Sequence, residues 1–172
     1  MRLSCNLLAR VFPLLIATVC SAAAIDPLVI PFHRQMKNGC GAASVAMVLH
    51  YWETDPPAPD VVYASLYQPV QNGISLSDMR DFLANQGLRA FTLRGEWRDL
   101  EQQLAKGRPL VVGLRNGRKK PLHFVVVTGV NADTVWLNDP TRKKPHHIPR
   151  EKFEKSWNLA DKWMLLAVPP AS

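Results

Sequence analysis

The stretch CGAASVAMVLHYW, residues 40–52, decides the fold of this chain. Small residues come first, and then almost every position is apolar. A helix that is apolar nearly all round is a buried one, so the stretch predicts a helix in the core of the domain. Cys40 stands at the start of this helix, where free backbone N–H groups and the helix dipole favour a thiolate. A buried, inert thiol is the alternative for a free cysteine.

The second half of the chain has a different pattern, with short runs rich in valine. These runs predict antiparallel strands, at 109–114, 123–130, 134–137 and 163–168. A short apolar run predicts one further strand near the N-terminus, at 28–32. Most of the helical patterns come before the valine-rich runs, at 40–52, 60–67, 76–86 and 97–105. Helices first and antiparallel strands later predict an α+β domain.

The composition is that of a globular domain. The 172 residues suffice for one domain, and hydrophobic and charged fractions of 47% and 20% exclude long disorder. The net charge is +7, and basic residues cluster in two predicted loops, at 115–120 and 142–144. Solvated loops are the default interpretation of these clusters, and a rim that steers a substrate is the alternative. Nucleic-acid binding is not expected, because no aromatic residues alternate with the charges. Neither a metal nor another cofactor is expected, because no C-x-x-C or H-E-x-x-H pattern occurs.

The first 24 residues predict a secretory signal peptide, which leaves a mature domain at residues 25–172. Arg2 and Arg10 give a positive start, an apolar run follows, and an A-x-A arrangement ends the segment. The apolar run of about nine residues is too short to span a bilayer. We therefore expect an exported protein of the periplasm or the extracellular space, with no membrane span after cleavage. Val19 stands where a lipoprotein carries a small residue, which argues against lipid on Cys20.

Cys40 is the one cysteine that remains after such cleavage, which indicates a reactive thiol or pairing between chains. A thiolate nucleophile needs a base, and His123 stands directly before the buried run FVVVTGV. The alternative for His123 is a half-exposed histidine at a strand end. Counting along the predicted hairpin places Asp139 opposite His123 to within one or two residues, close enough to hold the imidazole. Asn138 is the alternative for that role, because papain-like sites also use an amide.

Gln35 precedes Cys40 by five residues, and an amide there can donate to a developing oxyanion beside the Cys40 N–H. The ordered set Gln35, Cys40, His123 and Asp139 resembles the bacterial double-glycine leader peptidase family, papain-like cysteine peptidases that process bacteriocin precursors. The resemblance covers about residues 28–168. The segments that carry it are PFHRQMKNGCGAASVAMVLHYW (31–52), GISLSDMRDFLANQGLRA (73–90), PLHFVVVTGV (121–130) and WLNDP (136–140).

The resemblance implies a papain-like α+β fold, with an N-terminal helical half whose nucleophile helix packs on an antiparallel sheet. It also implies Cys40 as nucleophile, His123 as base, Asp139 as its orienting group and Gln35 in the oxyanion hole. Gly39 departs from the family, whose members usually carry an acidic residue there. Many members are fused to a membrane transporter with an ATPase, whereas this chain has no Walker A loop. We therefore expect a stand-alone exported relative without an ATPase domain, acting on a peptide or protein substrate.

Two other functions use the same residues. A transglutaminase-like acyl transferase has the same Cys-His-Asp order and passes the acyl group to an amine instead of water. A non-catalytic peptide-binding module on a peptidase fold is the third hypothesis. The presence of all four candidate residues argues against it, because a binding module has no chemical need for the set.

Overall fold

The helix expected in the core is α1, Cys40–Trp52, in a computed structural model that describes residues 26–171. Every residue of α1 from position 41 to position 49 is buried. The helix contacts strand β3 (His123–Val130) and two neighbouring helices, α2 (Pro59–Leu66) and α3 (Leu76–Asn85). Its lack of a polar face therefore matches its surroundings, which are protein on nearly all sides.

Six strands form one sheet in the order β1-β6-β2-β3-β4-β5, and all neighbouring strands are antiparallel. The remaining strands are β1 (Arg89–Arg94), β2 (Leu110–Leu114), β4 (Thr134–Asn138), β5 (His146–Pro149) and β6 (Trp163–Val168). The central strands β2 and β3 are buried at nearly every position. A strand whose two faces are both covered is apolar without alternation, which explains the valine-rich runs.

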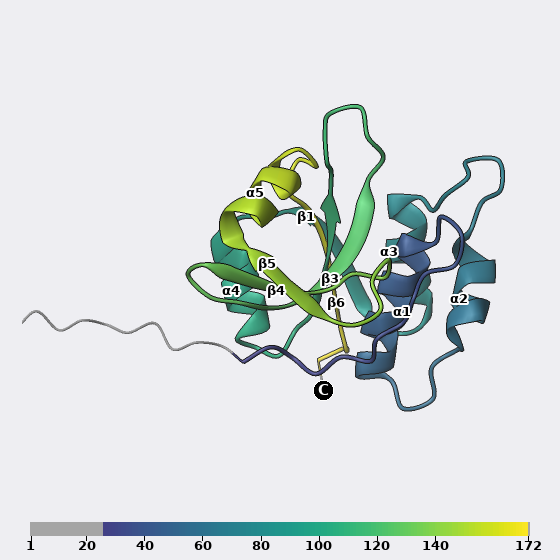
Figure 1. Cartoon of the computed structure of the whole chain (residues 1–172). Coiled ribbons are helices and arrows are strands. Elements are labelled where there is room, and N and C mark those ends of the chain that lie inside the picture. The colour runs from purple at the N-terminus through teal and green to yellow at the C-terminus, as the bar shows by residue number, and fades with distance from the viewer. Residues whose placement is uncertain (1–25, 172) are drawn as a thin grey trace, which may run out of the picture.

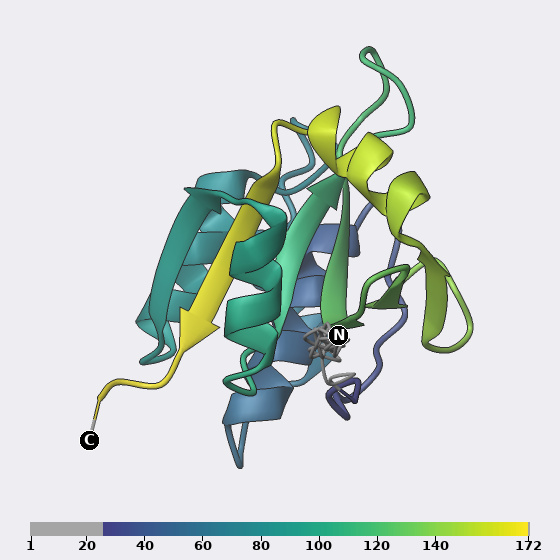
Figure 2. The same ribbon diagram turned by 90° about the vertical axis from the view of Figure 1, so that its left-hand side faces the viewer.

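Helices cover both faces of this sheet, as Figures 1 and 2 show. The helices α1, α2 and α3 lie on one face, and α4 (Trp97–Leu104) and α5 (Arg150–Asn158) lie on the other. Successive side chains of β3 enter different cores: Val126 joins the α1 side, whereas Val125 and Val127 join the α4–α5 side. The expected α+β fold, with the Cys40 helix packed on an antiparallel sheet, is confirmed.

The predicted strand at 28–32 is wrong. This segment is extended but belongs to no ladder, and one backbone hydrogen bond, from the Leu28 N–H to the Thr128 carbonyl at 2.8 Å, joins it to β3. Pro27 and Pro31 have no N–H to donate, so a regular ladder cannot form along the segment. It crosses β3 closely: a Cβ on Gly129 would lie 2.9 Å from the Cα of Pro27.

No strand was predicted directly after the basic cluster at 142–144, but His146 and His147 begin strand β5 at the edge of the sheet. The predicted signal peptide, residues 1–24, lies outside the described residues. Between residues 26 and 171, no helix has both the length and the apolar character that crossing a membrane requires.

Candidate active site

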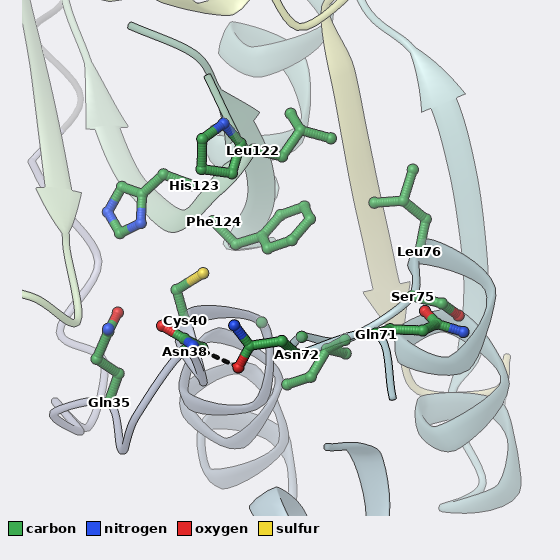
Figure 3. Close-up of a pocket in the computed structure, with 14 residues that line it drawn as sticks. Gln35, Asn38, Cys40, Gln71, Asn72, Ser75, Leu76, Leu122, His123 and Phe124 are labelled. Atoms are coloured by element: carbon green, nitrogen blue, oxygen red, sulfur yellow. Dashed lines mark hydrogen bonds between the residues drawn. The ribbon is translucent and has the colours of Figure 1, made fainter. Parts of the chain in front are cut away.

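Cys40 is the first residue of α1, and its side chain lies in a cleft opposite His123 (Figure 3). The preceding Gly39 packs so tightly that a Cβ there would lie 2.7 Å from the ring of Tyr63. The hydroxyl of Tyr63 donates to the Lys37 carbonyl at 2.9 Å. Tyr63 therefore braces the turn that leads into α1, and its ring explains why glycine fits at position 39. Of the residues from 26 to 171, Cys40 is the one free thiol.

His123 opens strand β3 and is held from behind by Asp139. Its Nε2 lies 2.8 Å from Oδ1 of Asp139, whose side chain is only 14% exposed. An ionised carboxylate can only accept, so Nε2 carries the proton of this hydrogen bond. Nδ1 is then the ring nitrogen left for Cys40, and the two nitrogens of one imidazole serve two different partners.

Asn138 is turned away from His123. It is buried, and its Nδ2 donates to the Ile30 carbonyl at 3.4 Å. Strand β4 ends at Asn138, and neighbouring residues of an extended chain point to opposite sides. Of the two alternatives, Asp139 is therefore the one beside the imidazole.

Burial disfavours the charged forms of Cys40, His123 and Asp139, but hydrogen bonds favour these forms more strongly. Burial raises the pKa of the Cys40 thiol, but hydrogen bonding with His123 and with the Phe124 backbone brings that pKa below its ordinary value. Burial lowers the pKa of His123, but Asp139 and Cys40 raise it to about 9. Burial also raises the pKa of Asp139, but hydrogen bonds from His123 and Thr141 hold it well below its usual range. The net shifts all favour the charged forms, a thiolate beside an imidazolium and a carboxylate.

Thr141 is a member of this cluster that the sequence analysis missed. Its N–H and its Oγ1 both donate to Oδ1 of Asp139, at 2.9 Å and 2.7 Å, and this is the same oxygen that binds His123. The only sequence signal is local, because an aspartate often bonds the backbone two residues further on in a turn. Thr141 thereby holds the carboxylate in the position from which it meets the imidazole.

Gln35 lines the cleft together with Cys40 and His123 (Figure 3). Its N–H donates to the Pro140 carbonyl at 3.0 Å, which ties the loop before α1 to the loop after Asp139. The side-chain Oε1 of Gln35 is buried and has no hydrogen-bond partner. Gln35, Cys40 and His123 thus face one cleft. Asp139, the fourth predicted residue, binds His123 on the side away from Cys40.

The cleft has a volume of about 650 Å³ and lies between two walls, residues 71–76 and residues 121–124. The first wall is tied to the loop before Cys40, because Asn38 Nδ2 donates to Asn72 Oδ1 at 2.8 Å. Gly41 packs against α3 and this wall: a Cβ at position 41 would lie 3.0 Å from the Met79 sulfur and at ordinary contact distance, 3.4 Å, from Ile74. This wall was not predicted from the sequence, although Asn72-Gly73 is a strong turn signal.

The remaining histidines lie outside the cleft. His33 Nε2 is 3.1 Å from His50 Nδ1, and His50 Nε2 donates to the Pro57 carbonyl at 2.9 Å. Burial and the neighbouring His50 both lower the pKa of His33. His146 and His147 are on β5. Within the part of the chain that the structure describes, no three His, Cys, Asp or Glu side chains are grouped to hold a metal.

Sequence comparison gives a family match over most of the chain. The profile described as the Peptidase_C39 like family matches residues 27–163, a span that includes Gln35, Cys40, His123 and Asp139. No curated protein matches the chain.

Solved structures of similar fold are more informative. A C39-like peptidase from Bacillus anthracis is 18% identical with a TM-score of 0.67, covering 85% of this chain and 98% of that one. The double-glycine-motif protease of the AMS/PCAT transporter, solved in complex with the leader peptide, is 26% identical with a TM-score of 0.64, covering 84% and 94%. The peptidase domain of Streptococcus ComA, a bifunctional ABC transporter of a quorum-sensing pathway, is 18% identical with a TM-score of 0.66, covering 84% and 98%.

Proposed function

Because the chain belongs to the Peptidase_C39 like family, and is thus a cysteine peptidase of papain-like fold, we propose that Cys40, His123 and Asp139 are its catalytic triad. The observation that carries the proposal is the 2.8 Å contact between His123 Nε2 and Asp139 Oδ1, on a ring whose other nitrogen is left for Cys40. This is the chain of nucleophile, base and orienting group that acyl-transfer chemistry requires.

Hydrolysis follows from the roles of the two ring nitrogens. The Cys40 thiolate attacks the carbonyl carbon of the scissile bond, and the carbonyl oxygen gains a negative charge. The imidazolium of His123 then gives its Nδ1 proton to the leaving amine as the C–N bond breaks. Water, deprotonated by the now neutral imidazole, attacks the thioester and releases the acid and the thiolate. Asp139 stays ionised throughout, since its pKa lies far below neutral pH.

Gln35 is proposed as a donor to the oxyanion, beside the Cys40 N–H. Support comes from its place in the cleft and from its side-chain amide, which has a buried atom without a partner. Half a turn of that amide exchanges its oxygen and its NH₂ group, and the NH₂ group is then the one available in the cleft. We expect Gln35→Ala to lower turnover by about 10²–10³ with little change in stability, as for other single oxyanion donors.

We further propose that the protein acts outside the cytoplasm on peptide or protein substrates. The pattern of residues 1–24 supports export. A peptide substrate is supported by the AMS/PCAT neighbour, which was solved with a leader peptide.

The test of the proposed function uses the purified protein and a library of peptides made from a digested bacterial proteome. New peptide ends are identified by mass spectrometry for the wild type, Cys40→Ala and Ser44→Ala. Ser44 is a matched control because it lies one turn further along α1 and its buried hydroxyl has no partner. We expect cleavage by the wild type and Ser44→Ala, and none by Cys40→Ala. Equal cleavage by Cys40→Ala would disprove the triad, and amine-linked products in place of new termini would indicate acyl transfer.

A further inference from the structure

Six exposed cations lie on two loops that lead to the residues of the cleft, and together they form what we call the basic rim. They are Arg118, Lys119, Lys120, Arg142, Lys143 and Lys144. The first loop joins β2 to β3 and projects beyond the end of the sheet in Figures 1 and 2. The second loop joins β4 to β5.

Both loops lead directly into the proposed catalytic residues. Lys120 is followed by Pro121 and Leu122, which line the cleft, and then by His123. The second loop begins at Asp139, and its Pro140 carbonyl accepts the Gln35 N–H. None of the six cations lines the cleft itself, but both loops are continuous in sequence with residues at its sheet side, one with His123 and the other with Asp139.

The charges of the basic rim are almost without partners. Arg142 is the one member near a carboxylate, with its Nε 4.0 Å from Asp139 Oδ2, and that carboxylate already binds His123. The other five members form no ion pair with any residue between 26 and 171. Closely spaced like charges repel one another, and no carboxylate of residues 26–171 offsets this repulsion for most of the six cations. An anionic ligand would reduce it.

The opposite wall of the cleft carries no charge. Residues 68–76 read QPVQNGISL, without a single lysine, arginine, aspartate or glutamate. A peptide lying between the walls therefore meets positive charge along one side only. In an extended peptide, alternate side chains point to the same side, so every second residue can face the basic rim.

We propose that this peptidase selects peptides with acidic residues flanking the bond it cuts, and that the basic rim is the specificity determinant. The inference rests on the proposed function, because it takes the cleft at Cys40 as the peptide site. Electrostatic complementarity of this kind mainly raises the association rate and the discrimination between substrates. A peptide is favoured over a nucleic acid because the basic rim contains no aromatic side chain on which a base could stack.

The kinetic test uses one well-cut sequence from the proteome-derived library, synthesised in two forms. The forms differ only in having Glu or Gln at the positions flanking the cut, so they match in size and differ in charge. We expect kcat/KM for the Glu form to exceed that for the Gln form by about tenfold at low ionic strength, with the preference shrinking as salt is added. The variants Lys119→Glu/Lys120→Glu and Lys143→Glu/Lys144→Glu should each lose most of this preference. Arg142 is left intact because it is close to Asp139.

A control variant makes the same change of charge far from the cleft. Arg98 and Lys106 are exposed, and they belong to α4 and the turn after it, on the other face of the sheet from α1. Lys106 precedes Gly107, whose carbonyl accepts from Tyr51 near the end of α1 remote from Cys40. Arg98→Glu/Lys106→Glu should keep the preference for the Glu form. Equal kcat/KM for the two forms in the wild type, or an unchanged preference in both rim variants, would overturn the proposal.

A binding measurement separates this proposal from the proposed function. Fluorescein-labelled (Glu-Gly)₅ and (Gln-Gly)₅ peptides are titrated with Cys40→Ala, with and without the rim substitutions, and followed by anisotropy. If no peptide is cleaved, the proposed function fails. In that case an acidic ligand is still supported if (Glu-Gly)₅ binds more tightly than (Gln-Gly)₅ and the rim substitutions abolish this difference. If peptides are cleaved but neither assay shows a charge preference, only the basic rim proposal fails. Rim-dependent binding of labelled (dT)₁₀ in place of (Glu-Gly)₅ would also overturn it.

Discussion

Two histidines in this protein are each held by another side chain, and the two partners shift the histidine pKa in opposite directions. His123 Nε2 lies 2.8 Å from an Asp139 oxygen, and its pKa rises to about 9. His33 Nε2 lies 3.1 Å from His50 Nδ1, and its pKa falls. Burial lowers the pKa of both rings, so the opposite outcomes come from the partners.

The difference shows what the proposed catalytic histidine, His123, requires of its partner. Asp139 carries a negative charge and can only accept, so it stabilises the protonated ring and fixes which nitrogen faces Cys40. His50 offers one neutral nitrogen to His33 because its other nitrogen donates to the Pro57 carbonyl. Between residues 26 and 171, no carboxylate lies beside His33 to offset a proton on its ring, and burial disfavours the protonated form. The first pair can therefore hold a positive charge next to a thiolate, and the second pair resists one.

The largest effect should come from removing the ring of the first pair. We expect His123→Ala to lower turnover by about 10³-fold or more, because base and acid are lost together. The pKa of the Cys40 thiol should rise toward its ordinary value, since hydrogen bonding with His123 no longer lowers it. The pH dependence of iodoacetamide labelling measures this shift. His33→Ala should leave the labelling profile where it is, and identical profiles for the wild type and His123→Ala would remove His123 from the site.

Removing the partner should have the next largest effect. Asp139→Ala should lower turnover by about 10²-fold or more and bring the pKa of His123 down from about 9, which narrows the pH range of the thiolate–imidazolium pair. The alkaline limb of kcat/KM against pH should therefore move to lower pH. Asp139→Asn should keep part of the activity, because an amide oxygen still accepts from Nε2. Asn138→Ala should mainly reduce thermal stability, since Asn138 is buried against the Ile30 carbonyl. A greater loss of turnover in folded Asn138→Ala than in Asp139→Ala would reverse the assignment.

A smaller effect is expected from Thr141, which holds the carboxylate. Thr141→Val keeps the shape and the backbone N–H but removes the Oγ1 donor, 2.7 Å from Asp139 Oδ1. Loss of one hydrogen bond of about 1 kcal/mol corresponds to about a fivefold fall in kcat. Thr141→Ser restores the hydroxyl and should recover most of it. If the valine and serine variants behave alike, the threonine hydroxyl does not position Asp139.

The smallest effect concerns stability, and its sign is opposite for the two histidines. The pKa of His33 is lowered on folding. Its favourable contribution to the free energy of unfolding is therefore present above about pH 6.5, and it is lost as the pH falls through the pKa of His33 in the folded protein. The pKa of His123 is raised, so its contribution is present below about pH 6.5 and is lost as the pH rises through about 9. Denaturant unfolding of the wild type and of His33→Gln between pH 5 and 9 measures the contribution of His33. We expect a difference below about 1 kcal/mol, confined to the acidic side, because solvent screens a half-exposed ring. A difference that is constant with pH would show that His33 contributes to stability through packing alone.

The sequence predicted the helices and strands whose residues form an apolar face or are apolar throughout. The α1 helix and the β3–β4 hairpin were both expected, because burial on all sides leaves few polar residues. The strand expected at 28–32 failed because its prolines remove donors that an apolar pattern does not reveal. Strand β5 was missed because HHIP is short and polar, and an edge strand tolerates both properties.

The surroundings of the candidate site were harder to predict than its members. The hairpin count brought Asp139 near His123, but the choice between Asp139 and Asn138 depended on where β4 ends and on a register shift between Val127 and Gly129. Thr141 and the wall at 71–76 were missed because their contacts join segments far apart in the sequence or depend on turn geometry. The catalytic roles of Cys40, His123, Asp139 and Gln35, and the export of the protein, stay predictions until the variants are measured.

The contact between Gly39 and Tyr63 means that these two positions must change together. A side chain at position 39 needs the space that the Tyr63 ring fills, and moving this ring breaks its hydrogen bond to Lys37 and its stacking on Tyr67. An acidic residue before the nucleophile, usual in the family that this chain resembles, is therefore compatible only with a smaller residue at 63. Introducing the acid alone should disturb the entry to α1, whereas introducing it with Tyr63→Ala should restore room for it. Tyr63 of α2, a helix some twenty positions later in the chain, thus limits which residue can precede Cys40.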